Sequence, residues 1–367
     1  MVPSCSMKKK LIVHVNSKSS FFHCSGLVIF SMFLIFCSIT EGSMQELCIP
    51  GNGTLWNGAF TPVEYHMNEM DISDESISSY IHHTGKPLAI ICFSHEWSLN
   101  RRFPADQAST IHSFGAIPYI RLMLRTDNKQ YQPEPFYTLK RIRDGYYDSD
   151  LRAFARDARD VSYPILIEYG TEMNGWWFSW NGYWTGKAEG TELFKSAYRH
   201  IIDVMDEEGA NNLYWVFHMN WHSNPEESWN APDNYYPGDE YIDIVGVSVY
   251  GALTRFENGT LSFSEMMNIG YKEAKNISPA KPVILSEIGT DLHNCNTPAY
   301  PWIEEVFLSL AKNSWPDLIG YVWWNAGWPI DSNYRNNTTM RIEEDPDIQV
   351  LFRKYLARDT VLGKVCG

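Results

Sequence analysis

The chain has 367 residues and a formal net charge of −14, which excludes proteins that hold a phosphate backbone with clustered Lys and Arg. Hydrophobic residues make up 44% of the sequence, as expected for a globular rather than a disordered protein. Aromatic residues make up 14%, which predicts either a large aromatic core or a surface groove lined with rings. We expect no nucleic-acid partner.

Residues 1–43 are typical of a secretory signal peptide. Lys8, Lys9 and Lys10 supply a basic start, residues 27–37 form an apolar run, and small residues suited to cleavage follow at 38–43. The apolar run is about half as long as a bilayer-spanning helix. A signal anchor is the alternative, because Phe21 and Phe22 lengthen the apolar region. We expect a secreted domain over 44–367, without stable insertion in a membrane.

Five N-x-S/T sequons agree with secretion and glycosylation; they begin at Asn52, Asn258, Asn276, Asn336 and Asn337. Four cysteines follow the signal segment: Cys48, Cys92, Cys295 and Cys366. Their spacing gives no metal-binding motif, and we expect neither a metal nor another cofactor.

Short apolar runs alternate with amphipathic stretches along residues 56–357. The expected strands cover 56–61, 88–93, 117–122, 164–169, 213–218, 242–249, 282–286 and 319–324. The expected helices cover 73–82, 106–114, 149–161, 192–208, 264–276, 302–312 and 347–357, with a loop rather than a helix after the fifth strand. Eight such units predict an α/β protein with a single-domain (β/α)8 TIM barrel. An open doubly wound sheet is the alternative, but no G-x-G-x-x-G or P-loop favours it.

The predicted barrel also brings together the two outermost cysteines that follow the signal segment. In a (β/α)8 barrel the first strand begins at the face to which the last helix returns. We therefore predict that Cys48 and Cys366 form a disulfide that joins the two ends of the domain, with a stability gain of roughly 4–5 kcal/mol.

Functional side chains gather where the expected strands end, which is where barrel enzymes place their active sites. The residues at the starts of the expected strands include few such side chains. The strand-end residues of most interest are His95, Arg125, Glu172, Asn174, His218, Asn220, Tyr250, Glu287 and Trp324.

Alternation along the fourth strand turns Glu168 and Glu172 into the barrel. A buried Glu168 needs a partner, and Arg121 of the third strand is the candidate. Glu172 comes later, where the interior opens to solvent. On the seventh strand, alternation places Val283, Leu285 and Glu287 on one inward face.

Glu172 and Glu287 are therefore expected to face each other across the barrel mouth. Two facing carboxylates suit glycoside hydrolysis, where one acts as nucleophile and the other as acid and then base. Indole rings also suit sugars, since sugar rings have apolar C–H faces. Tryptophans are expected on this face of the barrel at 176, 177, 180, 184, 221, 229, 323, 324 and 328, and we expect about half of them to be core.

The run E-M-N-G-W-W-F-S-W-N at 172–181 and S-E-I-G at 286–289 resemble glycoside hydrolase family 26, of the clan of retaining (β/α)8 glycosidases. The resemblance covers most of 55–356. It implies Glu172 as acid/base, Glu287 as nucleophile, Trp177 as an aromatic at the cleavage site, Tyr250 as the hydrogen-bond donor to the nucleophile and Trp324 as the platform under the reacting sugar. We also expect sugar contacts from Trp176, His95, His218, Asn220 and Asn174.

The resemblance implies hydrolysis of a β-linked polysaccharide by double displacement. For this chemistry we expect the pKa of Glu172 to be raised by Glu287 and indole burial, and that of Glu287 to be kept low by Tyr250. One departure concerns the substrate: mannanases of the family usually carry His before the acid, and here Thr171 stands there. Mannan, β-glucan and xylan all stay open, and a monomer is the expected state.

Two rival interpretations come from other classes. A carbohydrate-binding protein on an inactive glycosidase scaffold would usually have lost one of the two glutamates, and both are present. An esterase or a metal-dependent deacetylase would need a G-x-S-x-G elbow or His/Asp ligands, and neither appears.

Overall fold

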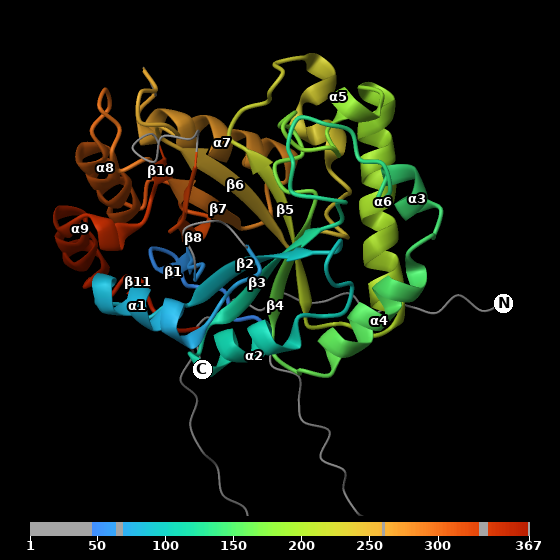
Figure 1. Ribbon diagram of the computed structural model, residues 1–367, viewed down its shortest axis with the longest axis horizontal. Helices are drawn as coiled ribbons and strands as arrows, with labels where there is room; N and C mark the ends of the chain where they lie inside the picture. Colours follow the sequence, from blue (N-terminus) through green and yellow to red (C-terminus); the bar gives the residue numbers. More distant parts are fainter. Residues whose placement is uncertain (1–45, 64–68, 259–260, 330–336, 366–367) are drawn as a thin grey trace, which may run out of the picture.

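The computed structural model describes residues 46–63, 69–258, 261–329 and 337–365. Eight parallel strands close into a barrel, because β1 pairs with both β2 and β8 (Figure 1). The strands are β1 Leu55–Phe60, β2 Ile90–Glu96, β3 Ile117–Met123, β4 Ile165–Tyr169, β5 Leu213–Asn220, β6 Ile244–Tyr250, β7 Val283–Gly289 and β8 Leu318–Trp324. The predicted (β/α)8 barrel is confirmed.

Helices surround the barrel, with α4 and α6 on one side and α8 and α9 on the opposite side (Figure 1). The main helices are α1 Asp74–Thr84, α2 Ala105–Ser113, α4 Asp148–Arg159, α6 Ala188–Glu207, α7 Phe263–Ile277, α8 Ala299–Ala311 and α9 Pro346–Leu356. Their starts follow local chemistry: Ser262 and Glu265 form a capping box on α7, and Asp345 caps α9, where Pro346 takes the first turn.

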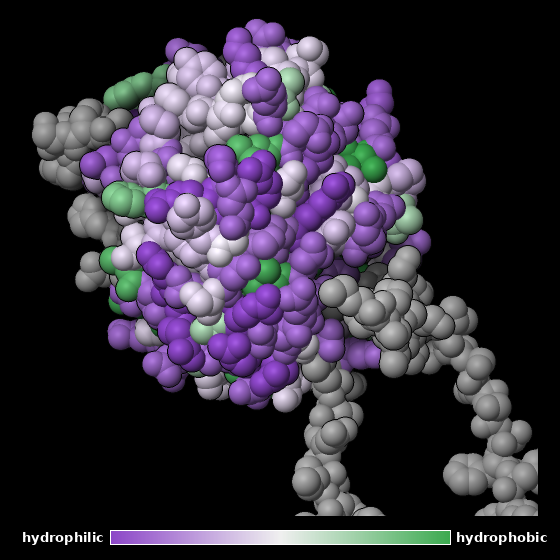
Figure 2. All heavy atoms as spheres, turned by 90° about the vertical axis from the view of Figure 1, so that its right-hand side faces the viewer, coloured by the Kyte–Doolittle hydropathy of each residue, from purple (hydrophilic) through white to green (hydrophobic). Residues whose placement is uncertain are grey.

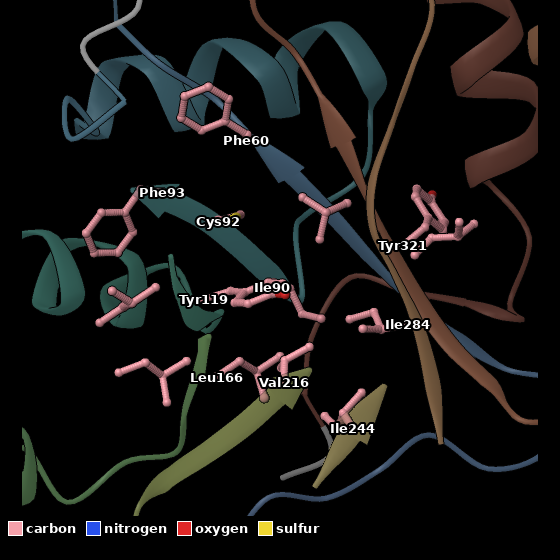
Figure 3. Packing of buried hydrophobic residues seen from close by; sticks show 14 of the residues in the cluster. Phe60, Ile90, Cys92, Phe93, Tyr119, Leu166, Val216, Ile244, Ile284 and Tyr321 are labelled. Atoms are coloured by element: carbon pink, nitrogen blue, oxygen red, sulfur yellow. The ribbon is translucent and has the colours of Figure 1, made fainter. Parts of the chain in front are cut away.

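The barrel interior is packed with side chains from successive strands. Figure 3 shows Tyr119 of β3, Leu166 of β4, Val216 of β5 and Ile284 of β7 converging in this core, and all four are buried. The hydroxyl of Tyr321 donates to Asn57 Oδ1 at 2.8 Å within the same core. The lower barrel is therefore a packed support for the residues at its mouth.

Several short elements were not expected from the sequence. These are α3 Leu139–Arg143, α5 Gly182–Thr185, the 3₁₀ turns η1 Ser228–Asn230, η2 Pro232–Tyr235 and η4 Ile342–Glu344, the pair β9 Gly327–Trp328 and β10 Thr338–Thr339, and β11 Val361–Leu362. The loop expected after the fifth strand holds only η1 and η2. Strand β11 pairs with the start of β1, where Leu55 lies opposite Val361.

The face of the molecule shown in Figure 2 is mostly hydrophilic, with apolar residues in small scattered groups. Among the described residues, no helix is long and apolar enough to cross a membrane. The predicted signal segment at 1–43, the sequon residue Asn336 and Cys366 lie outside the described residues. The Cys48–Cys366 disulfide therefore stays a prediction.

Candidate active site

A large cleft opens at the carboxyl ends of the strands, with a volume of about 1710 Å³. Glu172, Tyr250, Glu287 and Trp324 all line it, although they come from the ends of four different strands or the turns that follow them. The sequence placed these four residues together, and the structure brings them to one cavity. The fold therefore joins the two glutamates that are far apart in the chain.

Glu172 lies in a tight turn directly after β4. Its φ of 46° falls in the left-handed region that side chains other than Gly, Asn and Asp seldom adopt. The turn is held by the amide of Gly175, which donates to the carbonyl of Glu172 at 2.8 Å. The buried indole of Trp180 also donates to the carbonyl of Thr171 at 2.9 Å. Strain of this kind persists where the surroundings fix a functional side chain.

Trp177 orients the Glu172 carboxyl. Its Nε1–H donates to Glu172 Oε2 at 2.7 Å, and its ring lines the cleft. Gly175 makes this position possible, because a Cβ at Gly175 would lie 2.2 Å from the Trp177 ring. The glycine of the E-M-N-G run is thus required by the close approach of an indole.

Glu287 is held from two sides within the barrel mouth. The Tyr250 hydroxyl donates to its Oε2 at 2.6 Å, and Arg121 Nη2 lies 3.1 Å from its Oε1. The contact of Tyr250 with this carboxylate, which the resemblance implied, is present in the structure.

The simple alternation expected for the seventh strand is wrong. Ser286 Oγ lies 2.8 Å from the Tyr119 hydroxyl in the interior, and the next residue, Glu287, reaches Arg121 on the same side. Two consecutive inward side chains need an irregular strand. The pairing of β6 and β7 shifts register between Val247 and Ser248, and this shift turns Glu287 toward the mouth.

Burial raises the pKa of Glu287 to about 7, and the negative charge of Glu172 acts in the same direction. Arg121, His218 and the Tyr250 hydroxyl act against this shift without cancelling it. The expectation that Tyr250 keeps this pKa low is therefore wrong. Tyr250 lowers the pKa, but removal of the carboxyl from water has the larger effect.

Arg121 balances three carboxylates. Besides Glu287, it lies 3.0 Å from Glu69 Oε2 and 3.5 Å from Glu168 Oε1. Its guanidinium also lies 4.8 Å from the centre of the Trp324 ring. The predicted Arg121–Glu168 pair exists, but its distance is the longest of the three between Arg121 and a carboxylate. Glu69 was not foreseen, because it lies in an irregular segment between β1 and α1.

His218 belongs to the buried layer beneath the cleft. Its Nδ1 lies 2.9 Å from Glu168 Oε2 and 2.8 Å from Thr171 Oγ1, and its Nε2 lies 2.6 Å from Ser248 Oγ. Burial opposes its charged form, yet Glu168 raises its pKa. Neither His218 nor Thr171 is among the residues that line the cleft. Both support the site from below.

The other residues expected to contact sugar divide into two groups. Asn220 lines the cleft with Trp177, Tyr250 and Trp324. His95, Asn174 and Trp176 do not line it. His95 is fully buried against Phe154, and burial lowers its pKa to about 4. Asn174 is also buried and holds the backbone of Asn220 through both ends of its amide.

Several lining residues were missed by the sequence analysis because they lie in irregular loops without periodicity. They include Tyr131, Gln132, His222, Asn224, Leu253, Thr254, Glu257 and Leu261. Of the expected tryptophans, 177, 221, 324 and 328 line the cleft, whereas Trp180 and Trp323 are buried. Within the described part of the chain, no group of three or more His, Cys, Asp or Glu residues is arranged to hold a metal ion.

A parallel barrel with one glutamate after β4 and one at the end of β7, both in a single cleft, has the architecture of a (β/α)8 glycoside hydrolase. A profile of glycosyl hydrolase family 26 matches residues 147–301, which include both glutamates. The chain therefore resembles glycosyl hydrolase family 26, and in particular its β-mannanases.

Two curated relatives illustrate the similarity. Endoglucanase H of Acetivibrio thermocellus is 24% identical over 288 residues, which are 77% of this chain and 29% of that protein. A mannan endo-1,4-β-mannosidase of Bacillus subtilis is 28% identical over 174 residues, which are 46% of this chain and 41% of that protein. The chain therefore spans less than half the length of either relative.

Solved structures agree on the fold. A family 26 β-mannanase from Bacteroides ovatus has a TM-score of 0.58 at 15% identity, and the match covers 84% of this chain and 90% of that one. Bacillus subtilis mannanase man26 has a TM-score of 0.53 at 21% identity, with 75% and 81% covered.

Proposed function

We propose that this protein is a secreted, retaining endo-glycosidase that hydrolyses a β-linked polysaccharide. The observation that carries the proposal is the pairing of Glu172 and Glu287 in one cleft, each held by its own donor. Trp177 fixes the first at 2.7 Å and Tyr250 fixes the second at 2.6 Å. The family resemblance supports the same chemistry.

The proposed reaction has two steps. Glu287 attacks the anomeric carbon while Glu172 donates a proton to the departing glycosidic oxygen, which forms a glycosyl-enzyme. Glu172 then removes a proton from water, and this water displaces Glu287 from the sugar. Arg121 and Tyr250 hold the nucleophile in place in both steps, and the Arg121 charge stabilises its ionised form.

The shape of the site supports cutting within a chain rather than at its end. The cleft is about 1710 Å³ in volume, larger than a typical pocket for one small ligand of about 300–1,000 Å³. Rings of Trp177, Trp221, Trp324 and Trp328 are distributed along its lining. A cavity of this size can hold several linked sugars on both sides of the glutamates.

A β-glucan is the first candidate substrate. The endoglucanase relative matches 77% of this chain, whereas the first mannosidase relative matches 46%. Thr171 adds to this, because the family's mannanases usually carry His at this position. Mannan is the second candidate, favoured by the mannan endo-1,4-β-mannosidases among the relatives.

The test of the reaction is product release from mixed-linkage β-glucan, glucomannan, mannan, laminarin and xylan. Wild type is compared with Glu172→Ala, Glu287→Ala and the surface control Glu189→Ala. We expect one polymer to be cut to oligosaccharides with retained anomeric configuration, as followed by NMR, and losses of at least about 10²-fold in both site variants. Inversion at the anomeric carbon, or full activity without Glu287, would contradict the mechanism.

The rival function has its own outcome in the same experiment. A carbohydrate-binding protein would retain one polymer without releasing product. Secretion is tested separately by expression of the whole chain in a eukaryotic cell and sequencing of the mature N-terminus. We expect the protein in the medium, as a monomer, with cleavage near residue 43 and glycans on Asn52, Asn258 or Asn276.

A further inference from the structure

Four aromatic rings form a continuous cluster beside the cleft, which we name the aromatic platform: Tyr131, Trp176, Tyr183 and Trp184. Trp176 is at its centre. Its ring centroid lies 5.2 Å from that of Tyr131 and 5.3 Å from that of Tyr183. The indoles of Trp176 and Trp184 are within 9° of parallel, with centroids 6.5 Å apart. The cluster contains no aliphatic side chain.

The platform presents ring surface to solvent. Tyr131 and Tyr183 are 55% and 48% exposed, and both indoles are half-buried. Rings that only fill a core are covered by other residues, as Trp180 is in the neighbouring turn. Exposed Tyr and Trp side by side suit a ligand that is apolar on its faces and polar at its rim.

Backbone contacts hold the platform rigid. The Trp184 indole N–H donates to the carbonyl of Trp176 at 2.7 Å, which fixes one ring against the other's backbone. The segment stands on Asn181, which is buried and bonded to the carbonyl of Met173 at 2.7 Å. A ligand would therefore meet rings that are already in place, which lowers the entropic cost of binding.

Tyr131 joins the platform to the cleft. It lines the cleft and also contacts Trp176, and its amide donates to the carbonyl of Trp177 at 3.0 Å. Its φ of 60° is in the left-handed region, which Gly or Asn would adopt with less strain. A bulky, exposed ring kept at a strained position indicates that the ring itself is needed there.

We propose that the aromatic platform binds sugar residues of the same polysaccharide chain that the cleft cuts, at a distance from the bond that breaks. This inference rests on the proposed function. A long chain would occupy the cleft and then continue over Tyr131 onto Trp176 and Tyr183, where its ring faces stack. A short oligosaccharide that fills only the central cleft would not reach these rings.

The test compares two substrates of one composition: the polymer that wild type cuts and the tetrasaccharide prepared from it. The variants are Trp176→Ala, Tyr183→Ala and Tyr131→Asn, the last of which keeps the left-handed backbone without the ring. Tyr146→Ala is the matched control, since Tyr146 is 66% exposed and belongs to neither the cleft lining nor the platform. The readout is kcat/KM for the polymer divided by kcat/KM for the tetrasaccharide.

We expect this ratio to fall about three- to tenfold in each platform variant, the size of one aromatic contact, and to stay at the wild-type value in Tyr146→Ala. If the variants cut the polymer with an unchanged ratio, the proposal that the platform binds sugar is wrong, while the proposed function is unaffected. A ratio that falls equally in the control would also overturn the proposal for the platform.

If the protein cuts none of the polymers, the proposed function is wrong. Sugar binding by the platform is then tested by retardation of the protein in gels that contain each polymer. Loss of retardation in Tyr183→Ala but not in Tyr146→Ala would support it. Equal retardation of wild type and Tyr183→Ala, or none for wild type, would overturn it.

Discussion

The indole Nε1–H of Trp177 donates to Oε2 of Glu172 at 2.7 Å. This bond joins the residue expected to transfer protons to a ring that also forms part of the cleft wall. One side chain thus orients the catalytic carboxyl and shapes the space for the sugar. Variants that separate these two duties are therefore informative.

Trp177→Phe keeps an aromatic ring and removes the N–H donor. We expect kcat/KM to fall about tenfold, since a misaligned carboxyl transfers its proton less well. The loss should be larger for substrates with poor leaving groups, because these depend most on protonation. Trp180→Phe is the control: it removes an indole bond to the Thr171 carbonyl and should lower stability without a leaving-group effect. Equal losses for good and poor leaving groups in Trp177→Phe would contradict this role.

Gly175→Ala tests the packing that places Trp177. An added Cβ would lie 2.2 Å from the ring, so the indole must move away from Glu172. We expect at least about a tenfold loss of activity with a far smaller relative change in the unfolding temperature than core disruption would cause. Activity assays and thermal unfolding of the same sample check this. Wild-type activity would show that Trp177 does not depend on Gly175.

The pH dependence of kcat/KM should report Glu287. The nucleophile must be ionised, and burial and Glu172 raise its pKa to about 7, so activity should fall as the pH drops below this value. Tyr250→Phe removes a bond that lowers this pKa and should move the acid limb to higher pH. Glu172→Gln removes a charge that raises it and should move the limb to lower pH, as measured with an activated aryl glycoside. Shifts in the same direction would contradict the assignment.

The same carboxyl should make the protein less stable at neutral pH than in mild acid. Because the folded-state pKa of Glu287 lies above the ordinary value of 4.5, the folded protein holds a proton that the unfolded chain releases between about pH 4.5 and 7. Stability therefore falls as the pH rises through this window. Glu287→Gln carries no such charge.

We expect Glu287→Gln to be more stable than wild type at pH 8, by up to roughly 3 kcal/mol, with a smaller difference at pH 5. Denaturant unfolding at the two pH values measures both. The raised pKa of His218 acts in the same direction, and because the Glu287 charge contributes to it, this effect is smaller in Glu287→Gln and adds to the expected difference. If the difference in unfolding free energy between the two proteins is the same at both pH values, the pKa of Glu287 is not raised in the folded protein.

The barrel was predictable because its strands are short apolar runs at regular spacing, and their ends carried the polar residues. Glu172, Glu287, Tyr250 and Trp324 followed from that rule and from the family resemblance. The position of Glu287 was right although the alternation behind it was wrong. A register shift between β6 and β7 leaves no mark in the sequence, since Val247, Ser248 and Ser286 fit a regular strand equally well.

The remaining parts of the site depend on long-range packing. His95 and His218 resemble sugar ligands in sequence, but the fold buries both. Glu69 and Tyr131 lie in loops, where no periodicity indicates which way a side chain points. Only the three-dimensional structure shows that the first reaches Arg121 and the second reaches Trp176.

The pairing of β11 with the first residues of β1 also determines how the domain can be tethered. Leu55 lies opposite Val361, and the amide of Leu47 donates to the hydroxyl of Tyr214, near the start of β5. Both ends of the described domain therefore leave the barrel at the face opposite the cleft. A membrane anchor, a surface attachment or an added module joined at either end would hold the molecule by its base, with its mouth directed outward to the polymer.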